Sequence, residues 1–289
     1  MSLSFLSECK DKVLNRIDAL LPDTNKIVSA MRYSALADSK CIRAGLVFAS
    51  GNLNKEISNA ALIDMAASIE LMHTYSLIHD DLPSMDNDEM RRGQASNHLK
   101  YNEATAILAG DALQALAYET IVSSLEITQE QKIHSIKALA KACGHEGMIL
   151  GQQYDLDAEK NEYNDIKKIH ELKTGKLIQL AMTMPHLGNN NQKNQLMILD
   201  EAGKDLGLAF QIMDDVLEVS TDSSTLGKSN QSDLINKKLT YVSTYGMQES
   251  IDQAKALSNA CISKLENSFN DNEVTNLLEL AKFMVEREN

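Results

Sequence analysis

The chain has 289 residues, a formal net charge of −13 at pH 7, and a hydrophobic content of 43%, which is ordinary for a soluble globular protein. The acidic balance argues against nonspecific binding to nucleic acid, and the length allows one large domain or two. Three prolines and thirteen glycines are few for a β-rich chain of this size, because such chains need many turns. We therefore predict an all-α fold.

Helices are predicted one after another along the chain, with short breaks between them. The segment 60–79 has apolar side chains on nearly every face and is expected to be buried on all sides, and 102–123 shows the same pattern. The polar, turn-rich stretches 186–195 and 220–233 are predicted loops. The tail, 247–286, is predicted to be amphipathic and solvent-facing. The further predicted helices are 4–20, 130–143, 164–184 and 195–218, and a single domain over 1–289 is the simplest interpretation.

The cysteines and the N-terminal segment point to a cytoplasmic protein. None of the four cysteines has the spacing of a zinc site, so reduced thiols are expected. The opening "MSLSFLSECKDK" has charges where a signal peptide needs an apolar stretch. No uninterrupted apolar run approaches the roughly 20 residues of a membrane span, so none is predicted.

Two acidic clusters follow strongly apolar segments. The helix predicted over 60–79 leads into Asp80 and Asp81, and the run "LGLAFQIM" leads into Asp214 and Asp215. Magnesium is commonly held by one or two carboxylates together with substrate phosphates. The two clusters therefore predict cation sites that could face each other across a cavity, whereas a solvated acidic loop remains the alternative for either cluster alone.

Spacing within the clusters predicts which carboxylates act together. Asp214 and Glu218 are four residues apart and share a face of a helix. In the first cluster, Pro83 prevents a helix from running through the motif, so a loop must bring Asp80 and Asp86 together.

Arg91 and Arg92 follow the first cluster at once. Metal ions held by the carboxylates can bind phosphates, and the forked donors of arginine can bind the remaining oxygens, so the combination suits a strongly anionic ligand. The string "DNDEMRRG" fails as a calcium loop, because methionine and arginine stand where a ligand and a glycine are required. The absence of a GxxxxGK[ST] loop from the sequence argues against a nucleotide kinase.

Several motifs in a fixed order resemble those of trans-isoprenyl diphosphate synthases, most closely the bacterial farnesyl diphosphate synthases. They are "DDLPSMD", "RRG", "KTG", "FQIMDDVLE" and "LGK", supported by "MRYSALADSK", "YNEATAILAGDAL" and "GQQYDLD", and they extend from about residue 30 to residue 245. The resemblance implies an all-α isoprenoid synthase fold with helices around a deep central cavity, and a homodimer. It also implies a reaction in which dimethylallyl and then geranyl diphosphate ionises, isopentenyl diphosphate attacks the carbocation, and a proton is lost to give farnesyl diphosphate.

The resemblance further implies the cofactor, Mg²⁺ with three ions per active site, and the roles of individual residues. Ionisation leaves a pyrophosphate with more negative charge, which metal ions and arginine or lysine side chains stabilise. The implied metal ligands are Asp80, Asp86 and Asp214, with Asp81 and Glu218 near them; Arg91, Lys173 and Lys228 contact the allylic diphosphate; Thr174 and Gln211 lie beside the cation; and Lys40, Arg43, His73 and Arg92 bind isopentenyl diphosphate.

Chain length is predicted from the residues that precede the first cluster. Tyr75 lies five residues before Asp80, or about 7.5 Å of helix rise, and its ring can form the floor of the cavity. Ser76 is small and should not block the growing chain earlier. Together with the two-residue insertion in the first motif, this pattern resembles C15 synthases, whereas ordinary core packing of Tyr75 is the alternative.

The stretch "DSKCIRA" departs from the family pattern. Lys40 and Arg43 remain, but Cys41 stands in place of an arginine, and Asp38 is unfavourable near a diphosphate unless it points away. The second motif ends in Glu218 rather than aspartate. Activity is still expected, because the principal aspartates, arginines and lysine of the motifs are present.

Other functions are compatible with parts of the pattern. A geranylgeranyl diphosphate synthase would use the same chemistry, but Tyr75 argues against it. A class I terpene cyclase would not need the second diphosphate site that Lys40, Arg43 and Arg92 form. A non-catalytic partner subunit of a heteromeric synthase would be expected to lose an aspartate motif, and a helical scaffold with acidic loops would not need the ordered motifs.

Overall fold

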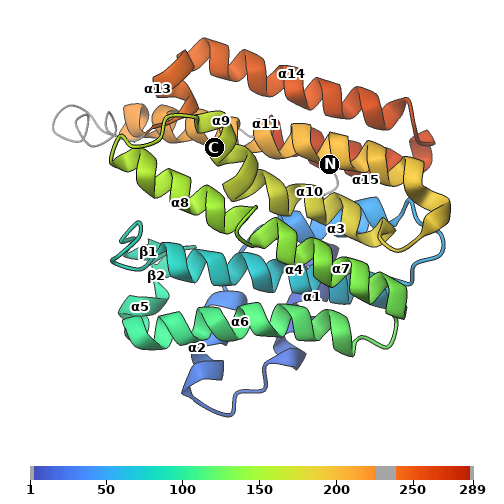
Figure 1. Ribbon diagram of the computed structural model, residues 1–289, viewed down its shortest axis with the longest axis horizontal. Coiled ribbons are helices and arrows are strands. Elements are labelled where there is room, and N and C mark those ends of the chain that lie inside the picture. The colour runs from blue at the N-terminus through green and yellow to red at the C-terminus, as the bar shows by residue number, and fades with distance from the viewer. Residues whose placement is uncertain (1–2, 226–238, 287–289) are drawn as a thin grey trace. The chain divides into compact units, whose positions relative to one another are not determined.

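The chain is helical over most of the residues that its structure, a computed structural model, describes, namely 3–225 and 239–286 (Figure 1). The strands within these ranges, β1 (Met90–Arg91) and β2 (Gln94–Ala95), form an antiparallel hairpin with Met90 opposite Ala95. The predicted all-α fold is confirmed.

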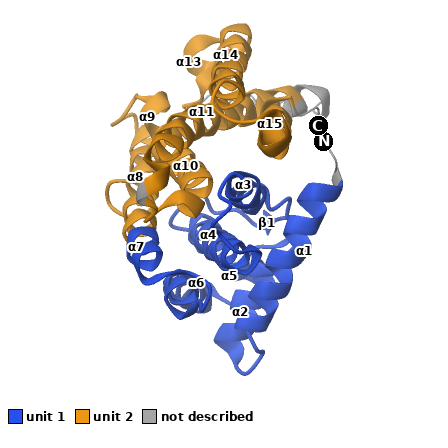
Figure 2. Cartoon of the chain, turned by 90° about the vertical axis from the view of Figure 1, so that its right-hand side faces the viewer, with its two compact units in different colours: residues 1–136 blue, residues 137–289 orange. Residues whose placement is uncertain are grey.

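The contacts divide the chain into two compact units, 1–136 and 137–289, which Figure 2 colours blue and orange. The single domain over 1–289 and the central cavity stay predictions.

In the first unit, the buried helix α4 (Asn59–Asp80) packs against α1 (Leu3–Leu20), α3 (Ile42–Gly51) and α6 (Glu103–Ser123). Each of several helices begins where a polar side chain caps free backbone N–H groups. Asn25 accepts hydrogen bonds at the start of α2, Ser58 at α4, and Asn102 at α6. The other helices that begin in this unit are α2 (Lys26–Ala35), α5 (Asn97–Lys100) and α7 (Gln129–Cys143).

In the second unit, the long helix α11 (Lys193–Thr225) packs against α10 (Lys176–Thr183) and α14 (Met247–Glu266). A π-helical turn, Glu171–Gly175, interrupts what was predicted as one helix over 164–184. The α-helices around it are α8 (Met148–Glu159), α9 (Ile166–His170), α10, α13 (Tyr241–Tyr245), α14 and α15 (Asp271–Val285), and short 3₁₀ helices span Met184–His186 and Asn190–Gln192.

The helices predicted over 4–20, 60–79 and 130–143 are confirmed within one residue at each end. The loop predicted over 186–195 is wrong in part, because it contains a 3₁₀ turn and the first turn of α11. The loop predicted over 220–233 is wrong as far as Thr225, because α11 continues to that residue; the rest lies outside the described residues.

Two predictions about burial are also corrected. The helix over 102–123 is not buried on all sides, since α6 exposes Ile107, Leu108 and Val122 on one face. The tail is amphipathic as predicted, but it is not only solvent-facing, because α15 buries an apolar face that includes Leu277 and Leu280.

All four cysteines are free and buried, as reduced core thiols would be. Burial raises the pKa of Cys9, Cys41 and Cys261 to about 12. Among the residues that the structure describes, no helix has both the length and the apolarity needed to cross a bilayer.

Candidate active site

The first aspartate cluster lies at the C-terminal end of α4. The helix ends at Asp80, and the chain then turns back so that the backbone N–H of Asp86 donates to the carbonyl oxygen of Asp80 at 2.9 Å. The turn includes a left-handed residue, Asn87, with φ 53°. Asp80 and Asp86 are each half-buried. The predicted loop that brings these two residues together is confirmed.

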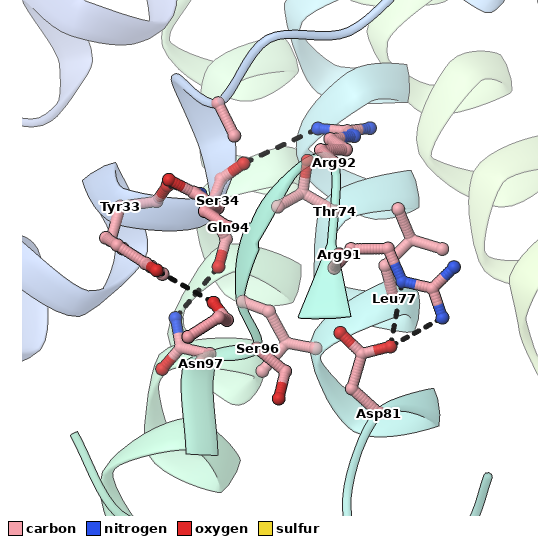
Figure 3. Close-up of a pocket in the computed structure, with 13 residues that line it drawn as sticks. Tyr33, Ser34, Thr74, Leu77, Asp81, Arg91, Arg92, Gln94, Ser96 and Asn97 are labelled. Carbon is pink, nitrogen blue, oxygen red and sulfur yellow. Dashed lines mark hydrogen bonds and ion pairs between the residues drawn. The ribbon is translucent and has the colours of Figure 1, made fainter. Parts of the chain in front are cut away.

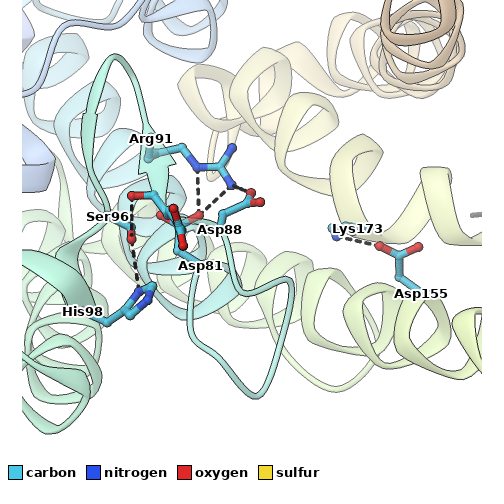
Figure 4. A network of polar contacts seen from close by, with 8 residues as sticks. Asp81, Asp88, Arg91, Ser96, His98, Asp155 and Lys173 are labelled. Atoms are coloured by element: carbon cyan, nitrogen blue, oxygen red, sulfur yellow. Dashed lines mark hydrogen bonds and ion pairs between the residues drawn. The ribbon is translucent and has the colours of Figure 1, made fainter. Parts of the chain in front are cut away.

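Asp81 has a different environment from its neighbour Asp80. Its carboxylate is buried, and its Oδ1 accepts hydrogen bonds from Nε and Nη2 of Arg91 at 2.8 and 2.6 Å (Figure 4). Nη2 of Arg91 also donates to Asp88 at 2.7 Å. Burial raises the pKa of Asp81, although the hydrogen bonds and positive charge of Arg91 oppose this effect. The structure therefore places Asp81 as the partner of Arg91.

The β-hairpin presents the two arginines of the "RRG" motif. Its turn residues, Arg92 and Gly93, both have positive φ, 53° and 76°, which is the pattern of a type I′ turn. The hairpin is attached to α2 because the Tyr33 hydroxyl donates to the carbonyl oxygen of Ala95 at 2.7 Å and Gln94 Nε2 donates to the carbonyl oxygen of Tyr33 at 3.0 Å (Figure 3). Asp81, Arg91 and Arg92 line a pocket between this hairpin and α4.

Two predicted ligands of isopentenyl diphosphate contact each other. Arg43 Nη1 lies 3.2 Å from Nε2 of His73. Because a guanidinium can only donate, this nitrogen of His73 is the acceptor and the ring is neutral. Burial, reinforced by the charge of Arg43, holds the pKa of His73 well below its usual value. Lys40 is exposed, on the stretch before α3.

Asp38, whose charge is unfavourable near a diphosphate, forms an ion pair with Lys10 of α1. The hydrogen bond from Lys10 lowers the pKa of Asp38, and the positive charge of Arg92 lowers it further. Lys10 was not predicted, because nothing in its local sequence links it to residue 38.

The predicted chain-length residues lie on α4. Tyr75 is 5% exposed, and its ring packs edge-on against His79 with 5.6 Å between the centroids. The hydroxyl of Ser76 donates to the carbonyl oxygen of His73 at 2.8 Å.

In the second unit, the π-helical turn carries Lys173 and Thr174. Lys173 Nζ donates to Asp155 at 2.7 Å (Figure 4). The Thr174 hydroxyl donates to Gln211 Oε1 at 2.7 Å. A Cβ at Gly151 would lie 2.2 Å from the backbone nitrogen of Lys173, so glycine is needed for α8 to approach the turn. A π-helical turn at this motif fits the tendency of such turns to occur at functional sites.

The second aspartate cluster lies within α11. Asp214 is half-buried and Glu218 is exposed, whereas Asp215 is 5% exposed. Asp215 Oδ2 lies 2.8 Å from Nε2 of His170 and accepts from the backbone N–H of Tyr241 at 2.7 Å. The predicted ligand Lys228 lies outside the described residues.

The structure thus brings together Asp80 with Asp86, Arg43 with His73, and Thr174 with Gln211. Within the described residues, no group of three or more histidine, cysteine, aspartate or glutamate side chains is close enough to hold a metal ion. The two aspartate clusters belong to different units, so their facing each other stays a prediction. Sequence reasoning missed residues that hold the motif side chains, namely Lys10, Asp88, Asp155 and His170, and gave Asp215 only as a member of the second acidic cluster.

Comparisons with known proteins agree on one family. The polyprenyl synthetase family model matches residues 24–280. The chain is 38% identical to the farnesyl diphosphate synthase of Escherichia coli (strain K12), over 96% of this chain and 95% of that protein.

Solved structures show the same fold. An FPP/GFPP synthase from Zymomonas mobilis superposes with a TM-score of 0.87 at 32% identity, over 99% of this chain and 100% of that one. A geranyltransferase from Helicobacter pylori, complexed with magnesium and isoprenyl diphosphate, superposes with a TM-score of 0.85 at 28% identity, over 99% of this chain and 98% of that one. With its ordered motifs and its isoprenoid synthase fold, the chain belongs to the polyprenyl synthetase family.

Proposed function

We propose that the chain is a magnesium-dependent prenyltransferase that condenses isopentenyl diphosphate with dimethylallyl and then geranyl diphosphate to make farnesyl diphosphate. The observation that carries the proposal is the loop that joins Asp86 to Asp80 beside an arginine-bearing hairpin. Similarity to farnesyl diphosphate synthases over nearly the whole chain supports the same reaction and product.

The donor chemistry fits magnesium. Asp80, Asp86 and Asp214 are half-buried carboxylates and supply the hard oxygen ligands that this ion prefers. Bound magnesium would neutralise the charge that develops on the departing pyrophosphate. Glu218 lies one turn beyond Asp214 and is proposed as an outer ligand, and three ions per active site stay part of the proposal.

The allylic diphosphate is proposed to bind through Arg91, Lys173 and Lys228. Arg91 is held by Asp81 and Lys173 by Asp155, so both cations are oriented before the substrate arrives. Thr174 and Gln211 share a hydrogen bond and are proposed to turn oxygen atoms toward the allylic cation.

Isopentenyl diphosphate is proposed to bind Lys40, Arg43, His73 and Arg92. The neutral ring of His73 holds Arg43 by accepting its hydrogen bond, and the full positive charge of the guanidinium remains for the diphosphate. The pairing of Asp38 with Lys10 supports a working site despite the altered "DSKCIRA" stretch.

This arrangement predicts a role for Lys10 in binding isopentenyl diphosphate. In a Lys10→Met variant, the unpaired charge of Asp38 should raise KM for isopentenyl diphosphate about threefold, the scale of an exposed ion pair, with kcat unchanged. Steady-state kinetics should show that adding Asp38→Asn restores KM. The exposed Lys26→Met variant is the matched control; an equal increase there would mean that net charge alone is responsible.

Tyr75 is proposed as the floor of the product cavity. Tyr75→Ala should shift the main product from C15 to C20 or longer, whereas Tyr75→Phe should keep C15 because the ring remains. Removing a buried ring should also lower stability by about 3–5 kcal/mol, so products are resolved at a temperature where the variant stays folded. C15 product from the alanine variant would assign Tyr75 to core packing.

A homodimer is proposed from the exposed apolar face of α6. Ile107, Leu108 and Val122 are 43%, 54% and 52% exposed and lie on one side of the helix, together with the exposed Ala104 and Ala115. An apolar stripe of this kind is typical of a surface that a second protein covers.

A cytoplasmic location and a single functional domain complete the proposal.

The function is tested by incubating the purified protein with magnesium, isopentenyl diphosphate and dimethylallyl diphosphate and resolving the products by chain length. We expect mainly C15. Mainly C20 would keep the chemistry and reject the Tyr75 floor. No elongation of dimethylallyl or geranyl diphosphate would favour a non-catalytic partner subunit.

A further inference from the structure

The second aspartate of the cluster in α11 forms a buried pair with a histidine. His170 and Asp215 are 6% and 5% exposed, and 2.8 Å separates Nε2 of His170 from Oδ2 of Asp215. The same carboxylate oxygen accepts the backbone N–H of Tyr241 at 2.7 Å. The Tyr241 ring stacks on the imidazole, with 5.8 Å between centroids and 20° between planes. One carboxylate therefore connects α9, α11 and the start of α13.

The two adjacent aspartates of α11 point in different directions. Successive residues of an α-helix are separated by about 100° around its axis, so a helix that buries Asp215 turns Asp214 toward another side. Asp214 is accordingly half-buried, and the carboxylate of Asp215 is occupied by two hydrogen bonds from the protein.

The position of His170 gives this pair a connection to the site. His170 is the last residue of α9, and the π-helical turn with Lys173 and Thr174 begins at the next residue. The far end of the turn is attached to α11 as well, because Thr174 donates to Gln211 and a Cβ at Gly207 would lie 2.8 Å from Gly175. The turn is therefore fixed to α11 at both ends.

Stability alone gives little reason for such a pair. A buried carboxylate is unfavourable unless its hydrogen bonds compensate the loss of water, and apolar residues of similar volume often serve stability as well or better. A pair that fixes the geometry of a diphosphate-binding turn has a use that apolar packing cannot supply.

We propose that Asp215 and His170 are positioning residues that hold the turn bearing Lys173 in register with the helix bearing Asp214, and that Asp215 is not itself a metal ligand. The inference rests on the proposed function for the identity of the ligand. Displacing a binding group by about 1 Å can cost a hundredfold in rate, so loss of the pair should weaken use of the allylic diphosphate specifically.

The first test compares the two neighbouring aspartates at a series of magnesium concentrations. Asp214→Asn should raise the magnesium concentration for half-maximal activity at least roughly tenfold, as expected for loss of a ligand. Asp215→Asn should leave that concentration within about twofold of wild type but raise KM for geranyl diphosphate roughly tenfold, with KM for isopentenyl diphosphate unchanged. An equal magnesium shift in both variants would make Asp215 a ligand and overturn the proposal.

The second test uses His170 with a conservative rescue. His170→Leu should raise KM for geranyl diphosphate roughly tenfold, whereas His170→Gln keeps an N–H donor at the place of Nε2 and should stay within about threefold. The matched control is His186→Leu, since His186 is also buried and hydrogen bonded, to Gln192 at 2.9 Å, but is remote in sequence from the motifs. If both leucine variants lower Tm and neither changes KM, His170 is structural only.

Calorimetric titration of inorganic pyrophosphate with magnesium provides a readout that is independent of turnover. The affinity should fall roughly tenfold in Asp215→Asn and in His170→Leu but not in His186→Leu. Unchanged affinity in the first two variants would reject the positioning role. If wild type binds pyrophosphate but makes no prenyl product, the proposed function fails while the positioning role is still decided by the titration.

Discussion

Replacing Asp80 by asparagine is expected to lower kcat about a thousandfold, with little change in Tm. Asparagine keeps the shape of the side chain at the end of α4 but removes the charge and one anionic oxygen. Metal stabilisation of a departing pyrophosphate amounts to several kcal/mol, and a loss of about 4 kcal/mol corresponds to about three powers of ten in rate. Steady-state kinetics at saturating magnesium and thermal unfolding together provide the measurement.

The matched control is Asp11→Asn, an exposed aspartate on α1 that makes the same change in net charge. It should retain the activity of wild type. If Asp80→Asn stays within tenfold of wild type, the first aspartate cluster is not the metal site and the account of the loop that joins Asp80 to Asp86 is wrong.

Asp81→Asn is expected to reduce kcat/KM for the allylic diphosphate roughly a hundredfold without lowering stability. The loss of activity follows because Arg91 would lose its charged partner, and charge-assisted hydrogen bonds contribute about 1.5–3 kcal/mol each. The double variant with Arg91→Met should be no worse than Arg91→Met alone, because residues that act as one unit are not additive. Additive losses would mean that Asp81 acts independently of Arg91.

The effect of this substitution on stability has a definite sign. Burial raises the pKa of Asp81 in the folded state, so the folded protein holds the proton more tightly than the unfolded chain. The stability that this group contributes is therefore present below its unfolded pKa and is lost as pH rises through its folded pKa. An asparagine does not titrate and is neutral like the protonated carboxyl, so Asp81→Asn should match the stability of wild type at low pH and be at least as stable as wild type at pH 7. Thermal unfolding between about pH 4 and pH 7 checks this.

Much of the fold could be predicted from local pattern. The apolar content of 60–79 predicts a buried helix, and Pro83 predicts the loop that returns Asp86 to Asp80. The π-helical turn at the "KTG" motif could not be predicted, because the apolar pattern over 164–184 predicts one helix and periodicity does not distinguish a π-helical turn from an α-helix.

The roles of neighbouring aspartates could not be predicted, because adjacent residues share the same local sequence. Burial of Asp81 and Asp215 depends on which side of α4 and α11 other elements cover, and their partners lie 10 and 45 residues away. The exposed face of α6 was missed for a related reason, since an exposed apolar side chain has the same local sequence as one in the core.

The central claim is that the two aspartate motifs support one metal-dependent condensation. The most direct test incubates the purified protein with geranyl and isopentenyl diphosphate and measures farnesyl diphosphate and released pyrophosphate in the same samples. We predict equal amounts of the two products, loss of both on addition of EDTA, and recovery on addition of excess magnesium. No condensation, or condensation that persists in EDTA, would contradict the account.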